Sequence, residues 1–225
     1  MLLRECLRVL FLIGVIGFPV GTLGASVEPS LCRKWSPVEM TKEHWSTAYE
    51  GFGRVVTKSS IQLQPRSIAS DAGTHAALVL MKNPITEKEF SLPIRYHNIK
   101  ALRTPSANPW EVFWLFFNYQ ALAGEKTTNY FIFKPNGVEI GKAWGKVNQE
   151  FLASAESPKL EMGKEYELIL DRHENKVSAF INGNKVLEFS DREKSKLYHQ
   201  AGQIGLYSED SEVEISSVDI CRNDH

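Results

Sequence analysis

The C-terminal third of the chain decides the fold, and it reads Tyr166-Glu-Leu-Ile-Leu-Asp171, Lys176-Val-Ser-Ala-Phe-Ile-Asn-Gly183, Lys185-Val-Leu-Glu-Phe-Ser-Asp191, Gly202-Gln-Ile-Gly-Leu-Tyr207 and Val213-Glu-Ile-Ser-Ser-Val-Asp-Ile220. These runs largely alternate apolar with polar residues, which is the period of a strand that buries one face. Asn182-Gly183-Asn184 and Glu209-Asp210-Ser211, between them, have the chemistry of hairpin turns. We therefore expect consecutive antiparallel strands, with Gly183 at positive φ.

The preceding part of the chain continues the same pattern, with Gly, Asn, Pro and charged residues at the breaks. A Pro135-Asn136-Gly137 turn joins two strands. The segment from Cys32 to Tyr49 could instead hold a helical turn. Further strands are expected at Ile61–Pro65, His75–Lys82, Phe90–Lys100, Glu111–Gln120 and Asn129–Lys134. The prediction is an all-β fold, a two-sheet antiparallel jelly-roll sandwich forming a single domain over residues 26–225.

Composition excludes some classes of function. The 225 residues include 26 Lys and Arg against 27 Asp and Glu, for a net charge of -1. Nucleic-acid-binding proteins usually show a surplus of basic residues, so no nucleic-acid partner is expected.

The N-terminus has the pattern of a secretory signal peptide over residues 1–25. Arg4 and Arg8 supply the positive charge, Val9 to Gly21 is apolar, and small residues near Ala25 offer a cleavage site. The alternative is an uncleaved anchor, but the apolar run is shorter than the roughly 20 residues of a spanning helix. We expect a secreted or periplasmic protein with no stable membrane insertion after cleavage.

Removal of Cys6 with the leader would leave Cys32 and Cys221, at opposite ends of the mature chain. Two cysteines in an exported protein predict a disulfide bond. Two unrelated buried thiols are the alternative.

The C-terminal strands resemble the concanavalin A-like lectin/glucanase superfamily, which includes laminin G-like domains. The resemblance rests on Val177-Ser-Ala-Phe-Ile-Asn-Gly183 and Gly202-Gln-Ile-Gly-Leu-Tyr207, and within the superfamily the pattern is most similar to 3-keto-disaccharide hydrolase-type domains. It covers about Met162 to Ile220. The resemblance implies a jelly roll whose first and last strands pair, which agrees with a Cys32–Cys221 bridge.

An aromatic segment, Trp110-Glu-Val-Phe-Trp-Leu-Phe-Phe-Asn-Tyr-Gln120, supplies the candidate site. Strict alternation places Phe113, Leu115, Phe117 and Tyr119 in the core. The other face then carries Trp110, Val112, Trp114, Phe116, Asn118 and Gln120. Flat rings beside amide groups suit a sugar, which stacks its apolar face and hydrogen-bonds its hydroxyls. Burial of both faces is the alternative. The candidate carbohydrate-binding residues are Trp110, Trp114, Asn118, Gln120, Tyr130, Lys134, Arg95 and His97, the last two bordering the same concave sheet.

Evidence for catalysis is sparse. The Glu-x-Asp-x-x-Glu strand of laminarinase-type glucanases is absent from the sequence. Arg95 with His97, and Tyr130 with Lys134, faintly resemble the arrangement in alginate lyases. The acidic stretch Glu209 to Glu212 is expected to be a solvated turn; it is the local candidate for a structural calcium ion, but it lacks an EF-hand pattern, and we expect no metal or cofactor.

These observations predict a secreted carbohydrate-binding jelly-roll module whose partner is a poly- or oligosaccharide. Two alternatives stay open. One is a polysaccharide-degrading enzyme of the same fold, either a glycoside hydrolase or a lyase. The other is a laminin G-like adhesion or protein-interaction module.

Overall fold

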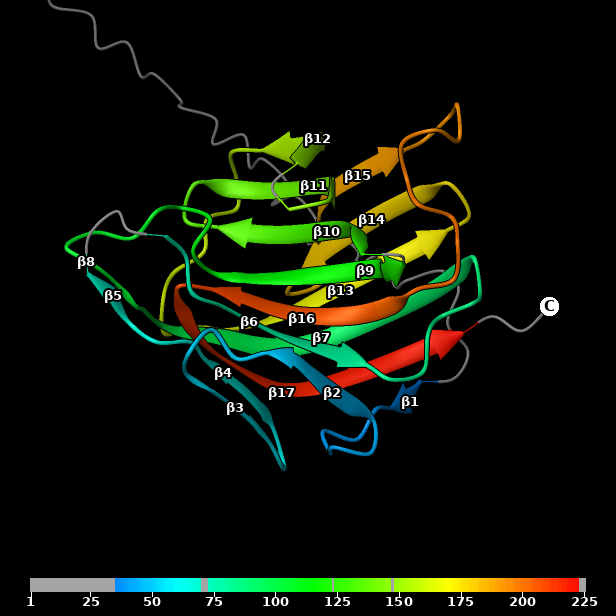
Figure 1. The fold of residues 1–225 in the computed structure, drawn as a ribbon. Helices are drawn as coiled ribbons and strands as arrows, with labels where there is room; N and C mark the ends of the chain where they lie inside the picture. The colour runs from blue at the N-terminus through cyan, green and yellow to red at the C-terminus, as the bar shows by residue number, and fades with distance from the viewer. Residues whose placement is uncertain (1–34, 70–72, 123, 147, 223–225) are drawn as a thin grey trace, which may run out of the picture.

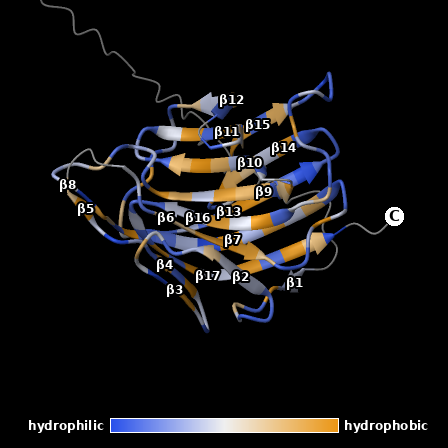
Figure 2. Cartoon of the chain, in the orientation of Figure 1, coloured by the Kyte–Doolittle hydropathy of each residue, from blue (hydrophilic) through white to orange (hydrophobic). Residues whose placement is uncertain are grey.

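The protein folds as two large antiparallel sheets packed face to face (Figure 1). A computed structural model describes residues 35–69, 73–122, 124–146 and 148–222, and these contain no helix. The hydrophobic residues are concentrated in the strands, and the connecting loops are mostly hydrophilic (Figure 2). The predicted all-β, two-sheet antiparallel jelly roll is confirmed.

The eight-stranded sheet has the order β15-β14-β13-β7-β17-β4-β3, with β1 paired to β17. Its strands are β15 (Asn184–Ser190), β14 (Lys176–Ile181), β13 (Glu165–His173), β7 (Glu89–Ala101), β17 (Ser211–Arg222), β4 (Ile61–Gln64), β3 (Arg54–Thr57) and β1 (Ser36–Pro37).

The seven-stranded sheet has the order β12-β11-β10-β9-β16-β6-β2. Its strands are β12 (Asn148–Ala155), β11 (Gly137–Trp144), β10 (Glu125–Lys134), β9 (Phe113–Leu122), β16 (Gln203–Glu209), β6 (Ala76–Met81) and β2 (Trp45–Tyr49). A short parallel pair, β5 (Ile68–Ala69) and β8 (Arg103–Thr104), lies apart from both sheets.

Every strand predicted from the sequence is present, with ends that differ by a few residues. The Asn182-Gly183 hairpin joins β14 to β15, and Asn182 and Gly183 have φ values of 50° and 77°. Two successive positive φ angles match a type I′ turn, so the predicted conformation of Gly183 is confirmed. The possible helical turn before Tyr49 is a hydrogen-bonded turn, with the Trp45 amide donating to Thr41 O at 3.0 Å, and β2 begins directly after it.

The hydrophobic core lies between the sheets. In β9 the side chains of Phe113, Leu115 and Phe117 are at most 1% exposed. Leu92 and Ile94 of β7 belong to the same cluster from the opposite sheet. Alternation along each strand therefore leaves the intervening side chains for the outer faces.

A bulge in β9 changes this alternation at Asn118. Asn118 has a φ of 56°, and the register shifts opposite it in both β10 and β16. A bulge adds one unpaired residue, so later side chains change face. Tyr119, predicted for the core, consequently belongs to a separate cluster with Leu78 and Leu80. Asn118, predicted for the outer face, accepts a hydrogen bond from buried Arg172 of β13 in the other sheet.

The N-terminal strand lies against the last strand, because Ser36 of β1 pairs with Ile220 of β17. Cys221 is buried beside this pair. Cys32 lies outside the described residues, so its bridge to Cys221 stays a prediction. Residues 1–25, predicted as a leader, also lie outside them, and the boundaries 26–225 of the domain are likewise untested. In the described ranges, no helix is both long and apolar enough to cross a membrane.

Candidate functional site

A groove of about 960 Å³ crosses the outer face of the seven-stranded sheet. Its lining residues come from β2, β9, β10, β11, β12 and β16 and from the loops beside them. The aromatic members are Tyr49, Trp114, Phe116, Tyr119, Trp144 and Tyr207. Gly205 of β16 lets the neighbouring side chains pack closely against its backbone. A Cβ at that position would lie 3.1 Å from both Leu78 Cδ1 and Phe116 Cβ.

The rings form a connected row across neighbouring strands. Phe116 and Tyr207 stack with centroids 4.9 Å apart, and Phe116 is parallel to Tyr119 at 6.4 Å. Trp114 meets Tyr207 edge to face at 5.9 Å. Such contacts fix the rings before any ligand arrives, which lowers the entropy lost on binding.

One side of the groove is held by a network around Tyr130. The Tyr130 hydroxyl donates to Glu139 Oε1 at 2.6 Å and accepts from Gln149 Nε2 at 2.7 Å. Lys134 Nζ donates to the second oxygen of Glu139 at 2.6 Å. Burial and the Glu139 carboxylate raise the pKa of the Tyr130 phenol, which therefore stays protonated and fixes the side chain of Gln149 at the groove.

The other side of the groove ends at Glu209, the last residue of β16. The Tyr207 hydroxyl donates to Glu209 Oε2 at 2.8 Å. Burial raises the pKa of this carboxyl to about 6, with a further contribution from the negative charges of Asp210 and Glu111. Burial also raises the pKa of Tyr49 and Tyr207, so both phenols keep their hydrogen-bond donors.

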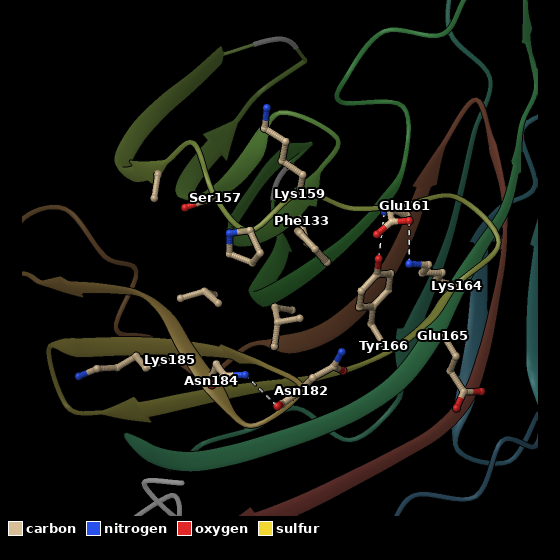
Figure 3. A pocket seen from close by; sticks show the side chains of 14 residues that line it. Phe133, Ser157, Lys159, Glu161, Lys164, Glu165, Tyr166, Asn182, Asn184 and Lys185 are labelled. Atoms are coloured by element: carbon tan, nitrogen blue, oxygen red, sulfur yellow. Dashed lines mark hydrogen bonds and ion pairs between the residues drawn. The ribbon is translucent and has the colours of Figure 1, made fainter. Parts of the chain in front are cut away.

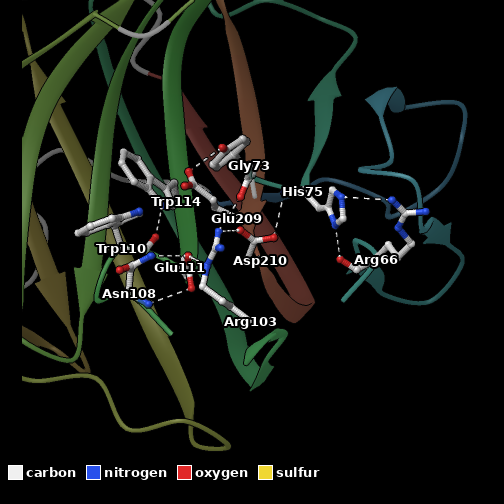
Figure 4. Close-up of polar contacts among 11 residues, drawn as sticks. Arg66, Gly73, His75, Arg103, Asn108, Trp110, Glu111, Trp114, Glu209 and Asp210 are labelled. Carbon is white, nitrogen blue, oxygen red and sulfur yellow. Dashed lines mark hydrogen bonds and ion pairs between the residues drawn. The ribbon is translucent and has the colours of Figure 1, made fainter. Parts of the chain in front are cut away.

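A buried ionic network fixes the turn that carries Glu209 (Figure 4). Arg103 donates to Glu111 and, at 2.6 Å, to Asp210 Oδ2. The side chains of Glu111 and Asp210 are both 0% exposed. The prediction of a solvated turn was therefore wrong, because Arg103 lies 107 residues before Asp210 and no local pattern shows that they meet.

The structure places most of the predicted site residues away from the groove. Trp114 lines it but is only 8% exposed, and Trp110 is 46% exposed outside the lining. Asn118 and Gln120 donate to the carbonyls of Gln200 and Ala201 at 2.7 and 2.5 Å, so they hold the loop between β15 and β16. Tyr130 and Lys134 contribute indirectly, through the Glu139 network.

Arg95 and His97 lie on β7, in the eight-stranded sheet. The expectation that they border the same sheet as Trp114 was wrong, since β7 pairs with β13 and β17 rather than with β9 or β10. The faint likeness to a lyase arrangement, which paired Arg95 and His97 with Tyr130 and Lys134, is therefore not realised in space.

Five of the six aromatic residues that line the groove were missing from the predicted site. Phe116 was expected on the outer face but was not assigned to the site, Tyr119 was expected in the core, and the other three were not site candidates. Trp144 ends β11, Tyr207 lies on β16 and Tyr49 ends β2. Tyr207 belongs to the quoted Gly202-Gln-Ile-Gly-Leu-Tyr207 strand, and its outward position follows from alternation with buried Ile204 and Leu206. Trp144 and Tyr49 carry no comparable signal, because each reaches the groove only through strand pairing.

A second hollow, of about 790 Å³, lies between the β14–β15 hairpin and the segment before β13 (Figure 3). Its polar groups largely bond to one another. Lys164 Nζ lies 2.7 Å from Glu161 Oε2, the Glu161 amide donates to the Tyr166 hydroxyl at 3.0 Å, and Asn184 donates to Asn182 O at 3.3 Å. The groove offers the larger volume and the row of rings, so it is the candidate site. Across the described residues, no group of three or more His, Cys, Asp or Glu side chains is placed to hold a metal ion.

Comparison with known proteins gives a fold and no family. No family model matches the sequence, and no curated protein matches it either. Among solved structures, a Bacillus subtilis protein of unknown function with a galectin-like fold matches with a TM-score of 0.61 at 12% identity, over 87% of this chain and 97% of that one.

Two further structures agree with the first. The carbohydrate-binding module CBM66 from Bacillus subtilis has a TM-score of 0.56 at 14% identity, covering 79% of this chain and 95% of its own. The exoplasmic/lumenal domain of VIP36, solved with Ca²⁺ and Man3GlcNAc, has a TM-score of 0.56 at 7% identity, over 84% and 87%. The chain therefore shares the jelly-roll fold of these structures, as the concanavalin A-like resemblance implied. Membership of that superfamily and the likeness to 3-keto-disaccharide hydrolase-type domains stay predictions.

Proposed function

We propose that this protein is a secreted or periplasmic module that binds a poly- or oligosaccharide in the groove of the seven-stranded sheet. One observation carries the proposal. A fixed row of aromatic rings from β9 and β16 lies between the Gln149 amide at one side and the Glu209 carboxyl at the other. Neighbours of the same fold include a carbohydrate-binding module and a domain solved with an oligosaccharide, and these support the choice of ligand.

The chemistry of the groove suits a sugar chain. A pyranose ring has an apolar face of C–H groups, which packs on flat aromatic rings, while its hydroxyls need hydrogen-bond partners at the edges. Trp144 is the tryptophan of the lining with an accessible ring, at 36% exposed, and the Lys142 amine lies 5.6 Å from its centroid. Trp144 is therefore the ring expected to stack on the ligand.

Substitution of Trp144 tests the proposal. Affinity electrophoresis against a panel of soluble polysaccharides should show retention of the protein by at least one of them, and Trp144→Ala should weaken that retention at least about fivefold, given aromatic contacts of about 1 kcal/mol or more. Trp110→Ala is the matched control, because Trp110 is 46% exposed but does not line the groove. Equal losses in both variants, or no retention by any polysaccharide, would contradict a binding site in the groove.

A further inference from the structure

We infer that the groove selects an uncharged glycan over an acidic one, and that Glu209 is the residue that determines this selection. The inference rests on the proposed function, since it concerns the ligand class of the same groove. It assigns Glu209 two roles: its carboxylate accepts hydrogen bonds from sugar hydroxyls, and its charge repels a uronate or sulfate group.

The hydrogen-bonding capacity of Glu209 supports the first role. Tyr207 donates to Oε2 at 2.8 Å, and in the described part of the chain no hydrogen-bond donor reaches Oε1. A carboxylate accepts through two oxygens, so Oε1 and the remaining lone pair of Oε2 face the groove without a protein partner. Hydroxyl groups of a sugar are donors that this oxygen pair can bind.

The charges around Glu209 support the second role. Asp210 and Glu111 lie close enough to raise its pKa, and the nearby Arg103 guanidinium is already bonded to both of them. Three carboxylates therefore share one cation at this side of the groove. A ligand carboxylate or sulfate here would add a like charge in a partly buried site, where screening by water and salt is weak.

The cations of the lining do not offset this arrangement. The described residues that line the groove include Lys126 and Lys146 but no arginine, and the paired N–H groups of arginine are what suit a carboxylate or sulfate best. The Lys126 amine lies 5.3 Å from the centroid of the Tyr49 ring. Both lysines are exposed, so their attraction for an anion is weakened by solvent and salt.

The test uses matched neutral and acidic probes with the full-length purified protein. Hydroxyethyl cellulose, dextran, curdlan and galactomannan are each compared with their carboxymethylated derivatives by affinity electrophoresis at pH 8. At least one neutral polymer should retain the protein at least tenfold more strongly than its carboxymethylated form. Glu209→Gln should weaken retention by the neutral polymer at least threefold and reduce the neutral-to-acidic ratio at least threefold.

Glu188→Gln is the control, because Glu188 is an exposed carboxylate on β15 of the eight-stranded sheet and does not line the groove; it should leave the ratio unchanged. Acidification from pH 8 to pH 5 should strengthen retention by the carboxymethylated polymer in the wild type and much less in Glu209→Gln, since protonation removes the charge of Glu209.

The outcomes separate this inference from the proposed function. Retention by the acidic polymer equal to or above that by the neutral one would overturn the selection for uncharged glycans while leaving glycan binding in place. A ratio that Glu209→Gln does not change would overturn the role of Glu209. Retention by neither kind of polymer would reject both the inference and the proposed function.

Discussion

The outer faces of the two sheets differ in chemistry although both belong to one sandwich. On the seven-stranded sheet, Phe116 stacks on Tyr207 at 4.9 Å and the rings continue along the groove. On the eight-stranded sheet, the outer side chains form polar pairs, such as Gln64 Nε2 donating to Glu212 Oε1 at 2.7 Å and Lys100 Nζ lying 3.3 Å from Glu212.

This difference shows that the fold does not require aromatic side chains on its outer face. The eight-stranded sheet shows that the fold tolerates a polar outer face, because burial of the inner faces supplies the main stabilising term. The partly exposed rings of the other sheet, Phe116, Tyr207 and Trp144, are therefore not required by the architecture. Surface rings gathered in a groove are typical of a binding site.

The largest expected effect on stability comes from a substitution on the aromatic face, at Gly141. A Cβ at this position would lie 2.2 Å from the Tyr130 hydroxyl oxygen and 2.7 Å from Glu150 O. Gly141→Val should lower the free energy of unfolding by about 3 kcal/mol, because the buried Tyr130 ring and the β12 backbone cannot both move away. Urea denaturation measures the change. A loss under about 0.5 kcal/mol would show that the rings on this face are loosely packed.

The next-largest effect is on the pH dependence of stability, and it differs between one carboxylate on each sheet, Glu209 and Glu188. The folded-state pKa of Glu209 is raised to about 6, so the folded protein binds the proton more tightly than the unfolded chain, and stability falls as pH rises from about 4.5 to above 6. Lys185 and Lys176 lower the pKa of Glu188 to about 2, so its contribution is present above about pH 4.5 and is lost as pH falls toward 2.

Opposite responses to substitution follow from these opposite shifts. Glu209→Gln should raise the free energy of unfolding at pH 8 by roughly 1–2 kcal/mol and change it little at pH 4. Glu188→Gln should lower the free energy slightly at pH 8, because its ion pairs are largely exposed. Urea denaturation at both pH values measures this, and the same sign for both variants at pH 8 would show that the two sites do not differ as described.

A smaller effect is expected in the hairpin of the eight-stranded sheet. Gly183 has a φ of 77°, but a Cβ added there would meet no atom within 4 Å, so the cost of Gly183→Val is one of backbone conformation and should be about 1 kcal/mol. Lys185→Ala, on the adjoining strand, should cost under about 0.5 kcal/mol because its pair with Glu188 is exposed. Equal effects in chemical denaturation would contradict the strained turn.

The smallest effect is expected at Arg95, which is exposed on β7. Arg95→Ala should change the free energy of unfolding by no more than about 0.5 kcal/mol and should leave retention by the polysaccharide unchanged, because the residue lies on the sheet opposite the groove. Weaker retention in this variant would mean that the ligand contacts the eight-stranded sheet.

The sequence by itself determined the strands and the tight turns. Alternation along Lys176–Ile181 predicted the buried side chains of Val177, Ala179 and Ile181, and Asn182-Gly183 predicted a turn with positive φ. These features are local, since strand period and turn conformation depend on neighbouring residues. The jelly-roll architecture followed from the order of such strands.

Only the tertiary structure decided where the groove lies and which residues line it. The bulge at Asn118 moved Tyr119 to the outer face, where strict alternation had placed it in the core. Pairing of β7 with β13 and β17 put Arg95 on the opposite sheet, and Arg103 buried the turn beside Glu209. Each of these outcomes depends on partners far apart in the chain, and the free energy of such contacts arises from packing and desolvation that no local pattern of residues encodes.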